Sequence, residues 1–120
     1  MVREFHELFN QPIGKRPRFV AKHALLRAAL ISEESAEVVT ALSDGDIVEI
    51  AKELADVLYV VYGTAVTYGI DLDAVFTAVH AANLTKLDEY GKPIFREDGK
   101  VKKSNRYKAP DIAKVLGVIK

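Results

Sequence analysis

The sequence predicts an all-α protein, a helical bundle of three long antiparallel helices with short helices near both termini. Apolar residues recur at helical spacing in three stretches, at 20–42, 46–68 and 71–90. Glycine and aspartate separate these stretches, at Asp44–Gly45–Asp46 and again at Gly69–Ile70–Asp71. A glycine that ends one helix and an aspartate that caps the next are typical of short helix–helix connections. The pattern therefore predicts helices joined by tight turns.

The segments on either side of these helices are shorter. Residues 3–10 fit a short helix, and prolines and a glycine between 12 and 17 break the chain before the first long helix begins near Phe19. The third long helix is expected to close near Tyr90–Gly91. Beyond it, Asp98–Gly99 between short apolar runs predicts a small hairpin or an ordered tail, and Pro110–Asp111 starts a last short helix.

The middle helix is apolar nearly all round between Leu54 and Tyr62. Its β-branched valines would also suit a buried strand, but the length of the segment and the caps at both ends favour a helix. A helix on the surface of a monomer should have a polar face, and three helices in so short a chain cannot cover this one on every side. We therefore expect a homodimer, or a higher homo-oligomer, whose helices complete a four-helix-type core.

Composition excludes several classes of protein. The chain has no cysteine, which rules out disulfides, thiolate nucleophiles and zinc–thiolate sites and suits a reducing, cytoplasmic location. Its 17 basic residues balance 17 acidic ones, so a broad surface for nucleic acid is not expected. The N-terminus lacks the apolar region of a signal peptide, and the longest apolar run is too short to span a bilayer. We expect a one-domain protein with no membrane partner.

Four acids stand out at matching positions on the first two long helices. Glu34 and Glu37 are three residues apart, as are Glu53 and Asp56, so each pair shares one helix face. In an antiparallel hairpin, residues equally far from the turn lie at the same height. Glu37 and Glu53 are each eight residues from Gly45, and the other two acids are each eleven residues away. The four carboxylates should therefore converge.

Such a cluster predicts a divalent metal. Carboxylates packed among apolar residues are costly to ionise, and no histidine or lysine is expected close enough to neutralise them. Oxygen ligands favour Mg²⁺, with Mn²⁺ as a substitute.

Other interpretations of the acidic residues fit less well. A di-iron bundle needs Glu-x-x-His pairs that this sequence lacks, and a calcium loop beginning at Asp71 would have Phe76 where it needs glycine. The alternative that stays open is a non-catalytic helical dimerisation or interaction module with a solvated acidic face.

These residues resemble those of the MazG-like all-α nucleoside triphosphate pyrophosphohydrolases, in the branch that includes the phosphoribosyl-ATP pyrophosphohydrolases. The resemblance rests on Glu-Glu-x-x-Glu at 33–37, Glu-x-x-Asp at 53–56, Asn83-x-x-Lys86 and the tail around Asp98-Gly99-Lys100. It extends from about Leu26 to Ile112, with the first twenty or so residues matching weakly. It implies a single MazG-like domain over residues 1–120.

The resemblance also implies an activity, namely Mg²⁺-dependent hydrolysis of a nucleoside triphosphate to the monophosphate and pyrophosphate, with dUTP or non-standard nucleotides as candidate substrates. Glu34, Glu37, Glu53 and Asp56 match the metal ligands. Glu33 matches a position proposed in relatives to orient or deprotonate the attacking water. The resemblance further suggests a set of residues that contact the substrate, which are Asn83, Lys86, Lys103 and Tyr107.

Asn83 and Lys86 are also unusual in their own right. Asn83 is a poor helix former on the apolar stripe of the third long helix, where a core residue would be expected, and Lys86 shares its face. A buried amide beside a lysine that extends its charge to solvent is the structural alternative to substrate binding.

Overall fold

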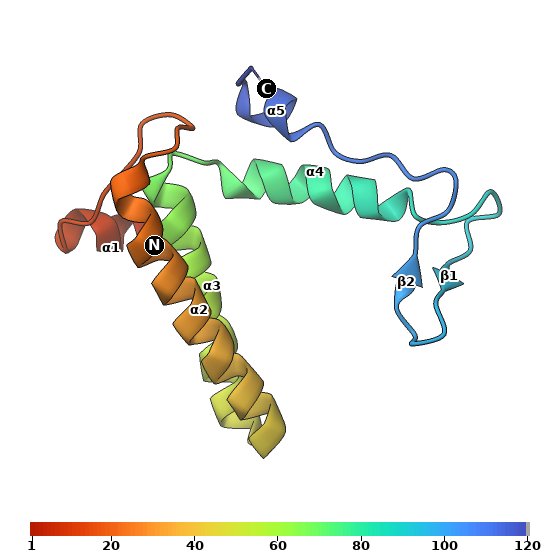
Figure 1. The fold of residues 1–120 in the computed structure, drawn as a ribbon, viewed down its shortest axis with the longest axis horizontal. Coiled ribbons are helices and arrows are strands. Elements are labelled where there is room, and N and C mark those ends of the chain that lie inside the picture. Colours follow the sequence, from red (N-terminus) through yellow and green to blue (C-terminus); the bar gives the residue numbers. More distant parts are fainter. Residues whose placement is uncertain (120) are drawn as a thin grey trace. The chain divides into compact units, whose positions relative to one another are not determined.

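The protein is built mainly from helices, as the sequence predicts. The computed structural model describes residues 1–119, which form five helices and one two-stranded antiparallel sheet (Figure 1). The all-α class is therefore confirmed. The chain divides into two compact units, of which the first comprises residues 1–70 and the second begins at Asp71. The expectation of one domain stays a prediction, as does the antiparallel packing of all three long helices.

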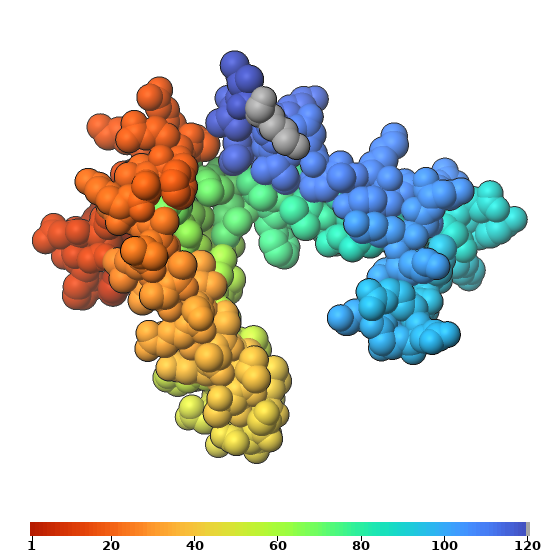
Figure 2. All heavy atoms as spheres, viewed as in Figure 1, coloured from red at the N-terminus to blue at the C-terminus, as the bar shows by residue number. Residues whose placement is uncertain are grey.

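An antiparallel helical hairpin dominates the first unit. Helices α2 (Ala21–Asp44) and α3 (Ile47–Thr67) lie side by side, and they run from orange to yellow-green in Figure 2. Gly45 adopts a left-handed conformation, with φ of 76°, which favours glycine. The Asp46 carboxylate accepts hydrogen bonds from two backbone N–H groups in the first turn of α3, at 2.9 and 3.4 Å. The predicted turn is confirmed, and its two residues fix the register of the helices.

Arg27 joins the two helices toward the end of the hairpin that lies away from this turn. Its Nε donates to Thr64 Oγ1 at 3.0 Å, and its Nη2 donates to the carbonyl of Val60 at 2.9 Å. The guanidinium lies over Gly63, where a Cβ atom would come within 2.5 Å of Nη2. Arg27 is 6 % exposed. A buried arginine is thus satisfied by hydrogen bonds at a place where α3 has no side chain.

Helix α1 (Val2–Leu8) packs against α3. His6 is buried, and its Nδ1 lies 2.8 Å from the carbonyl of Pro12, to which it donates. The ring of Phe5 meets that of Tyr59 edge-on, with 5.6 Å between the ring centroids. His6 therefore has a structural role.

The first unit leaves much of its apolar surface uncovered. Its buried hydrophobic residues are small, Ala41 and Ala65, whereas Leu25 is 86 % exposed and Leu58 54 % exposed. Further large apolar side chains exposed on α2 and α3 are Leu26, Val39, Leu42, Ile47, Val48, Leu54 and Tyr59. Among the described residues, no helix combines the length and apolarity needed to cross a membrane. Large apolar side chains of both α2 and α3 are thus exposed.

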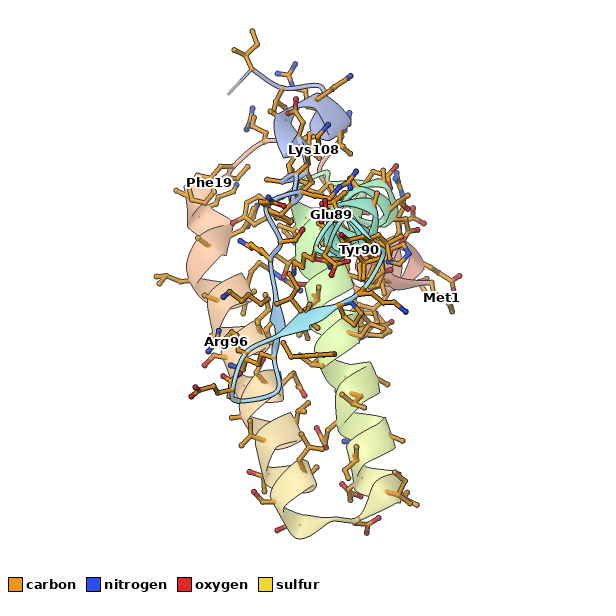
Figure 3. The ribbon with its side chains drawn as sticks, turned by 90° about the vertical axis from the view of Figure 1, so that its right-hand side faces the viewer. Met1, Phe19, Glu89, Tyr90, Arg96 and Lys108 are labelled. Carbon is orange, nitrogen blue, oxygen red and sulfur yellow. The ribbon has the colours of Figure 1, made fainter. Side chains whose placement is uncertain are left out.

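The second unit contains the remaining elements. Helix α4 (Leu72–Leu84) is capped by the Asp71 carboxylate, which accepts from the N–H of Ala74 at 3.1 Å. Strands β1 (Ile94–Phe95) and β2 (Val101–Lys102) pair antiparallel, so the expected hairpin is present. In its turn, labelled at Arg96 in Figure 3, an ion pair of 2.8 Å joins Arg96 to Asp98. Helix α5 (Ile112–Leu116) follows Asp111, as predicted.

The third long helix is shorter than the sequence suggested. Helix α4 ends at Leu84, before the expected end near Tyr90–Gly91. At the next residue, the Thr85 hydroxyl donates to the carbonyl of Ala82 at 2.7 Å and accepts from the N–H of Lys108 at 2.9 Å. The C-terminal segment thus binds the chain where a longer helix would have continued, and this contact between distant residues replaces helical hydrogen bonds.

We predict that Gly63→Ala destabilises the protein. Alanine normally favours a helix over glycine by about 1 kcal/mol. Here the new Cβ would displace the Arg27 guanidinium from its buried hydrogen bonds, and such overpacking costs about 1–3 kcal/mol. Urea unfolding at one fixed protein concentration would measure the loss.

The Arg27→Met background is the control, because it removes the group that the new Cβ would approach most closely. In that background the substitution at position 63 should cost much less than in the natural sequence. A gain in stability from Gly63→Ala in the natural background would show that Arg27 moves aside freely, and would contradict the prediction.

Candidate active site

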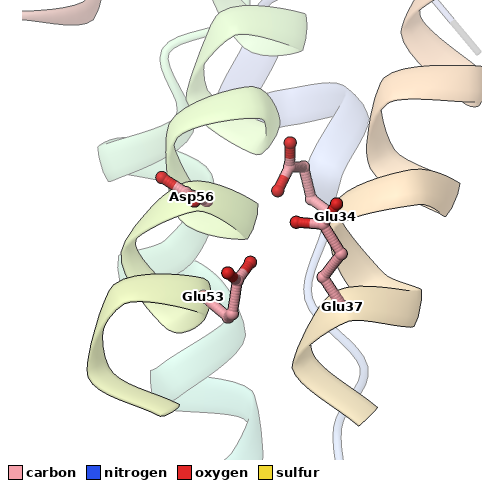
Figure 4. Close-up of side chains that lie close together, drawn as sticks. All are labelled: Glu34, Glu37, Glu53 and Asp56. Carbon is pink, nitrogen blue, oxygen red and sulfur yellow. The ribbon is translucent and has the colours of Figure 1, made fainter. Parts of the chain in front are cut away.

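The four acids predicted to converge do so. Glu34 and Glu37 project from α2 toward Glu53 and Asp56 of α3, as Figure 4 shows. One carboxylate oxygen from each residue lies within 4.8 Å of those of the other three. The register set at Gly45 therefore places the two carboxylate edges opposite each other, as the equal distances along the sequence required.

Two oxygens of this cluster are buried without a partner. Glu34 Oε2 and Glu53 Oε2 make no hydrogen bond among the described residues, and Glu53 as a whole is 7 % exposed. A buried carboxylate oxygen without a hydrogen bond or counter-charge is costly, so such oxygens call for a cation. The cluster offers only oxygen ligands, a donor set that suits hard divalent cations such as Mg²⁺ and Mn²⁺. The residues present therefore fit the predicted metal.

Repulsion within the cluster is visible in the pKa of Glu37. Its pKa is raised to about 7, first by a hydrogen bond with Glu53 and then by the negative charges of Glu34 and Glu53. The ordinary value for this side chain is 4.5. Glu37 is the exposed member of the cluster, so burial is a minor cause. Without a metal, the cluster thus favours holding one proton between facing carboxylates near neutral pH.

A lysine also contacts the cluster, which corrects the expectation that no lysine lies close enough to neutralise it. Lys52 Nζ is 3.1 Å from Glu53 Oε1 and 3.0 Å from Asp56 Oδ2. These two carboxylates raise the pKa of Lys52 above its usual range. The i, i+4 spacing of Lys52 and Asp56 was the signal in the sequence that could have revealed the contact.

A pocket of about 410 Å³ extends from the cluster toward the hairpin turn. Glu37 and Glu53 line one end of it, and further acids line the rest, namely Asp44, Asp46 and Glu49. Small or uncharged side chains complete the wall: Ala36, Thr40 and Ala41. Because five carboxyl groups face this space, a phosphate group would be repelled from it unless cations were bound there as well.

Glu33 lies outside the four-acid cluster. It is exposed on α2, one residue before Glu34 and four before Glu37. Adjacent helical residues point about 100° apart, so Glu33 and Glu34 present their carboxylates in different directions. The position of Glu33 is therefore beside the cluster but distinct from its ligand face.

Three of the four predicted substrate-binding residues come together in the second unit. Lys103 Nζ lies 4.6 Å from the centroid of the Tyr107 ring, and Lys86 Nζ lies 6.0 Å from it. Backbone contacts hold this arrangement, since the N–H of Ser104 donates to the carbonyl of Lys86 at 3.2 Å and its hydroxyl donates to that of Leu87 at 2.7 Å. Two ammonium groups thus approach one aromatic ring.

Asn83, the fourth of these residues, lies in the last turn of α4 and is exposed. Its carbonyl accepts from the N–H of Lys86 at 3.1 Å. The Asn83 side chain is exposed. Its surroundings in the second unit therefore do not support a role as a buried structural amide.

A family comparison covers most of the helical part of the chain. Residues 2–83 match the model of the phosphoribosyl-ATP pyrophosphohydrolase family. The match includes all four clustered acids, Glu33 and Asn83, and it reaches the N-terminal residues that had seemed weakly matched. Lys86, Lys103 and Tyr107 lie beyond it, so their assignment rests on the resemblance and on their mutual contacts.

One curated relative is a viral protein. The chain is 32 % identical, over 105 residues, to uncharacterized protein L479 of Acanthamoeba polyphaga mimivirus. The alignment covers 80 % of this chain and 39 % of the viral protein, so the chain spans well under half the length of that relative. On the strength of the family match over residues 2–83, the chain belongs to the phosphoribosyl-ATP pyrophosphohydrolase family, within the MazG-like nucleoside triphosphate pyrophosphohydrolase superfamily.

Proposed function

We propose that this protein hydrolyses a nucleoside triphosphate between its α and β phosphates, releasing the monophosphate and pyrophosphate. The observation that carries the proposal is the convergence of Glu34, Glu37, Glu53 and Asp56, with two buried oxygens left unpartnered, in a member of a pyrophosphohydrolase family. A non-catalytic interaction module would have no need to hold mutually repelling carboxylates at this separation.

Mg²⁺ is the proposed cofactor, with Mn²⁺ as a substitute. The four clustered acids would hold the metal, which when bound would neutralise the charge that develops on the phosphates. The acidic pocket beside the cluster supports this assignment, because a triphosphate needs a counter-charge to approach Glu37 and Glu53.

The protein's own side chains would position the other reactants. Glu33, beside the ligand face, would orient or deprotonate the water that attacks the phosphate. Asn83 and Lys86 would contact the sugar or phosphate of the substrate, and Lys103 and Tyr107 would also contact the substrate. The convergence of the two ammonium groups on Tyr107 supports a shared role in binding.

For the substrate we propose dUTP or a non-standard nucleoside triphosphate. Its hydrolysis would remove it from the pool of nucleoside triphosphates. The MazG-like resemblance supports this choice. Phosphoribosyl-ATP belongs beside these nucleotides in any comparison of substrates, because the matched family is named for it. The absence of cysteine supports action in the reducing cytoplasm.

We also propose a homodimer as the smallest assembly. The exposed apolar side chains on α2 and α3, Leu25, Leu54 and Leu58 among them, support it. A second copy that packed on the hairpin would bury these side chains and complete a four-helix core.

The first prediction for this function concerns the products. The protein should release pyrophosphate and a monophosphate in equal amounts, and a chelator should abolish release until Mg²⁺ or Mn²⁺ is restored. Glu53→Gln should lower the rate by about a hundredfold or more, because it removes a buried metal ligand. Anion-exchange chromatography of a nucleotide panel, including dUTP and phosphoribosyl-ATP, would identify the products.

Glu4→Gln is the matched control, since it makes the same change at an exposed position of α1. It should leave the rate unchanged. Orthophosphate as the sole product, or full activity in chelator, would refute the proposed reaction.

The second prediction separates Glu33 from the metal ligands. Glu33→Gln should lower turnover by about two to four decades while changing metal affinity little, because its carboxylate would act on water. Glu37→Gln should weaken both turnover and metal affinity. Circular dichroism would first establish that both variants fold, and calorimetric titration with Mn²⁺ would then report affinity. Normal turnover in Glu33→Gln would remove it from catalysis, and an affinity as low as that of Glu37→Gln would make it a ligand.

The third prediction concerns assembly. Light scattering at micromolar concentration should give at least twice the mass of one chain. Leu58→Glu, which places a charge among the exposed apolar side chains of α3, should shift the protein toward monomers. A folded monomer in the natural sequence would overturn the proposed dimer.

A further inference from the structure

Lys52 stands apart from the other cations of the first unit because both of its ion pairs are with members of the acidic cluster. Its Nζ lies 3.1 Å from Glu53 Oε1 and 3.0 Å from Asp56 Oδ2. Glu49, three residues earlier on α3, is also in reach by helical spacing, yet it forms no salt bridge among the described residues. Lys52 is thus directed toward the cluster rather than toward the available acid on the other side.

The two contacts leave the buried oxygen of Glu53 free. Lys52 Nζ donates to Glu53 Oε1, whereas Glu53 Oε2 is buried and has no hydrogen-bond partner among the described residues. The Lys52 side chain itself is 61 % exposed, and that of Glu53 is 9 % exposed. The ammonium therefore approaches from the solvent side and neutralises part of the charge, while the interior of the cluster keeps its negative charge.

A divalent cation in the cluster would act against these contacts. It would draw on the same carboxylates and would repel an ammonium held at hydrogen-bond distance from two of them. Lys52 has a long, flexible side chain on an exposed helical position, so it can turn to solvent at small cost. The ammonium and the divalent metal therefore favour different states of one site.

We propose that Lys52 is the internal counter-cation of the metal-free site, which stabilises the empty acidic cluster and is displaced from it when a divalent metal binds. The inference rests on the proposed function, because it takes the four acids as metal ligands. Its consequence is a direct exchange between stability and affinity. The free energy by which Lys52 stabilises the metal-free protein against unfolding is lost from the free energy of metal binding.

The experiment is a thermodynamic cycle on Lys52→Met, with Mn²⁺ alone as the probe. Calorimetric titration should show Mn²⁺ binding about three- to tenfold more tightly, the range expected for removal of two ion pairs made by an exposed lysine. Urea unfolding in chelator should show a loss of about the same factor in the folding equilibrium constant. In saturating Mn²⁺ the stabilities of the variant and the natural protein should coincide.

Lys52→Arg should restore both quantities toward those of the natural protein, because it keeps the charge. Lys22→Met removes a lysine from an exposed position of α2 that makes no ion pair among the described residues, and it should change neither quantity. If Lys52→Met does not fold without metal, Lys52→Gln provides the same test with a polar side chain.

Three results would overturn the inference. Weaker Mn²⁺ binding by Lys52→Met would make the lysine a group that orients the ligands. Unchanged affinity with equal losses of stability in both states would make it a purely structural ion pair. Unchanged affinity and stability would make it a spectator.

The cycle uses no nucleotide, so its outcome is separate from the test of the reaction. Should the natural protein bind Mn²⁺ and release pyrophosphate, a failure at Lys52 concerns this residue alone. Should the natural protein bind no metal, the proposed function fails with it.

Discussion

Mutual repulsion among four carboxylates is the interaction around which the first unit is organised. Glu34, Glu37, Glu53 and Asp56 meet because the turn at Gly45 allows the two helices one register. The repulsion is offset only in part by the ion pairs of Lys52, and it contributes to raising the pKa of Glu37 to about 7. The arrangement has negative charge to spare, which suits the binding of a divalent cation.

At the opposite end of the hairpin, polar side chains join the helices to one another. There Arg27 reaches across to Thr64 and Val60, and His6 secures α1 through the carbonyl of Pro12. Arg27 and His6 are buried with hydrogen-bond partners, whereas one carboxylate oxygen each of Glu34 and Glu53 is buried without one. One end of the helix pair thus holds the structure together, so that the middle can hold groups that repel each other.

Local features made much of this arrangement predictable from the sequence. Asp46 and Asp71 cap helices through contacts with residues two or three positions away, so their roles could be predicted from the local sequence. The convergence of Glu37 with Glu53 followed from counting outward from Gly45. What escaped prediction depends on side-chain direction or on distant contacts. Lys52 turns toward Asp56 rather than to solvent, and Thr85 ends α4 by bonding to Lys108.

The two-residue connection at Gly45 also limits how this gene can change in length. One residue inserted into a single arm between the turn and the acids would rotate that arm's carboxylates by about 100° and move them by about 1.5 Å along the axis. The opposite arm would stay in place, and the two acidic edges would no longer meet. Roughly seven residues added to both arms, which is close to two whole turns, would instead lengthen the hairpin and keep the edges opposed. Viable insertions in this part of the family should therefore come in pairs of matched length.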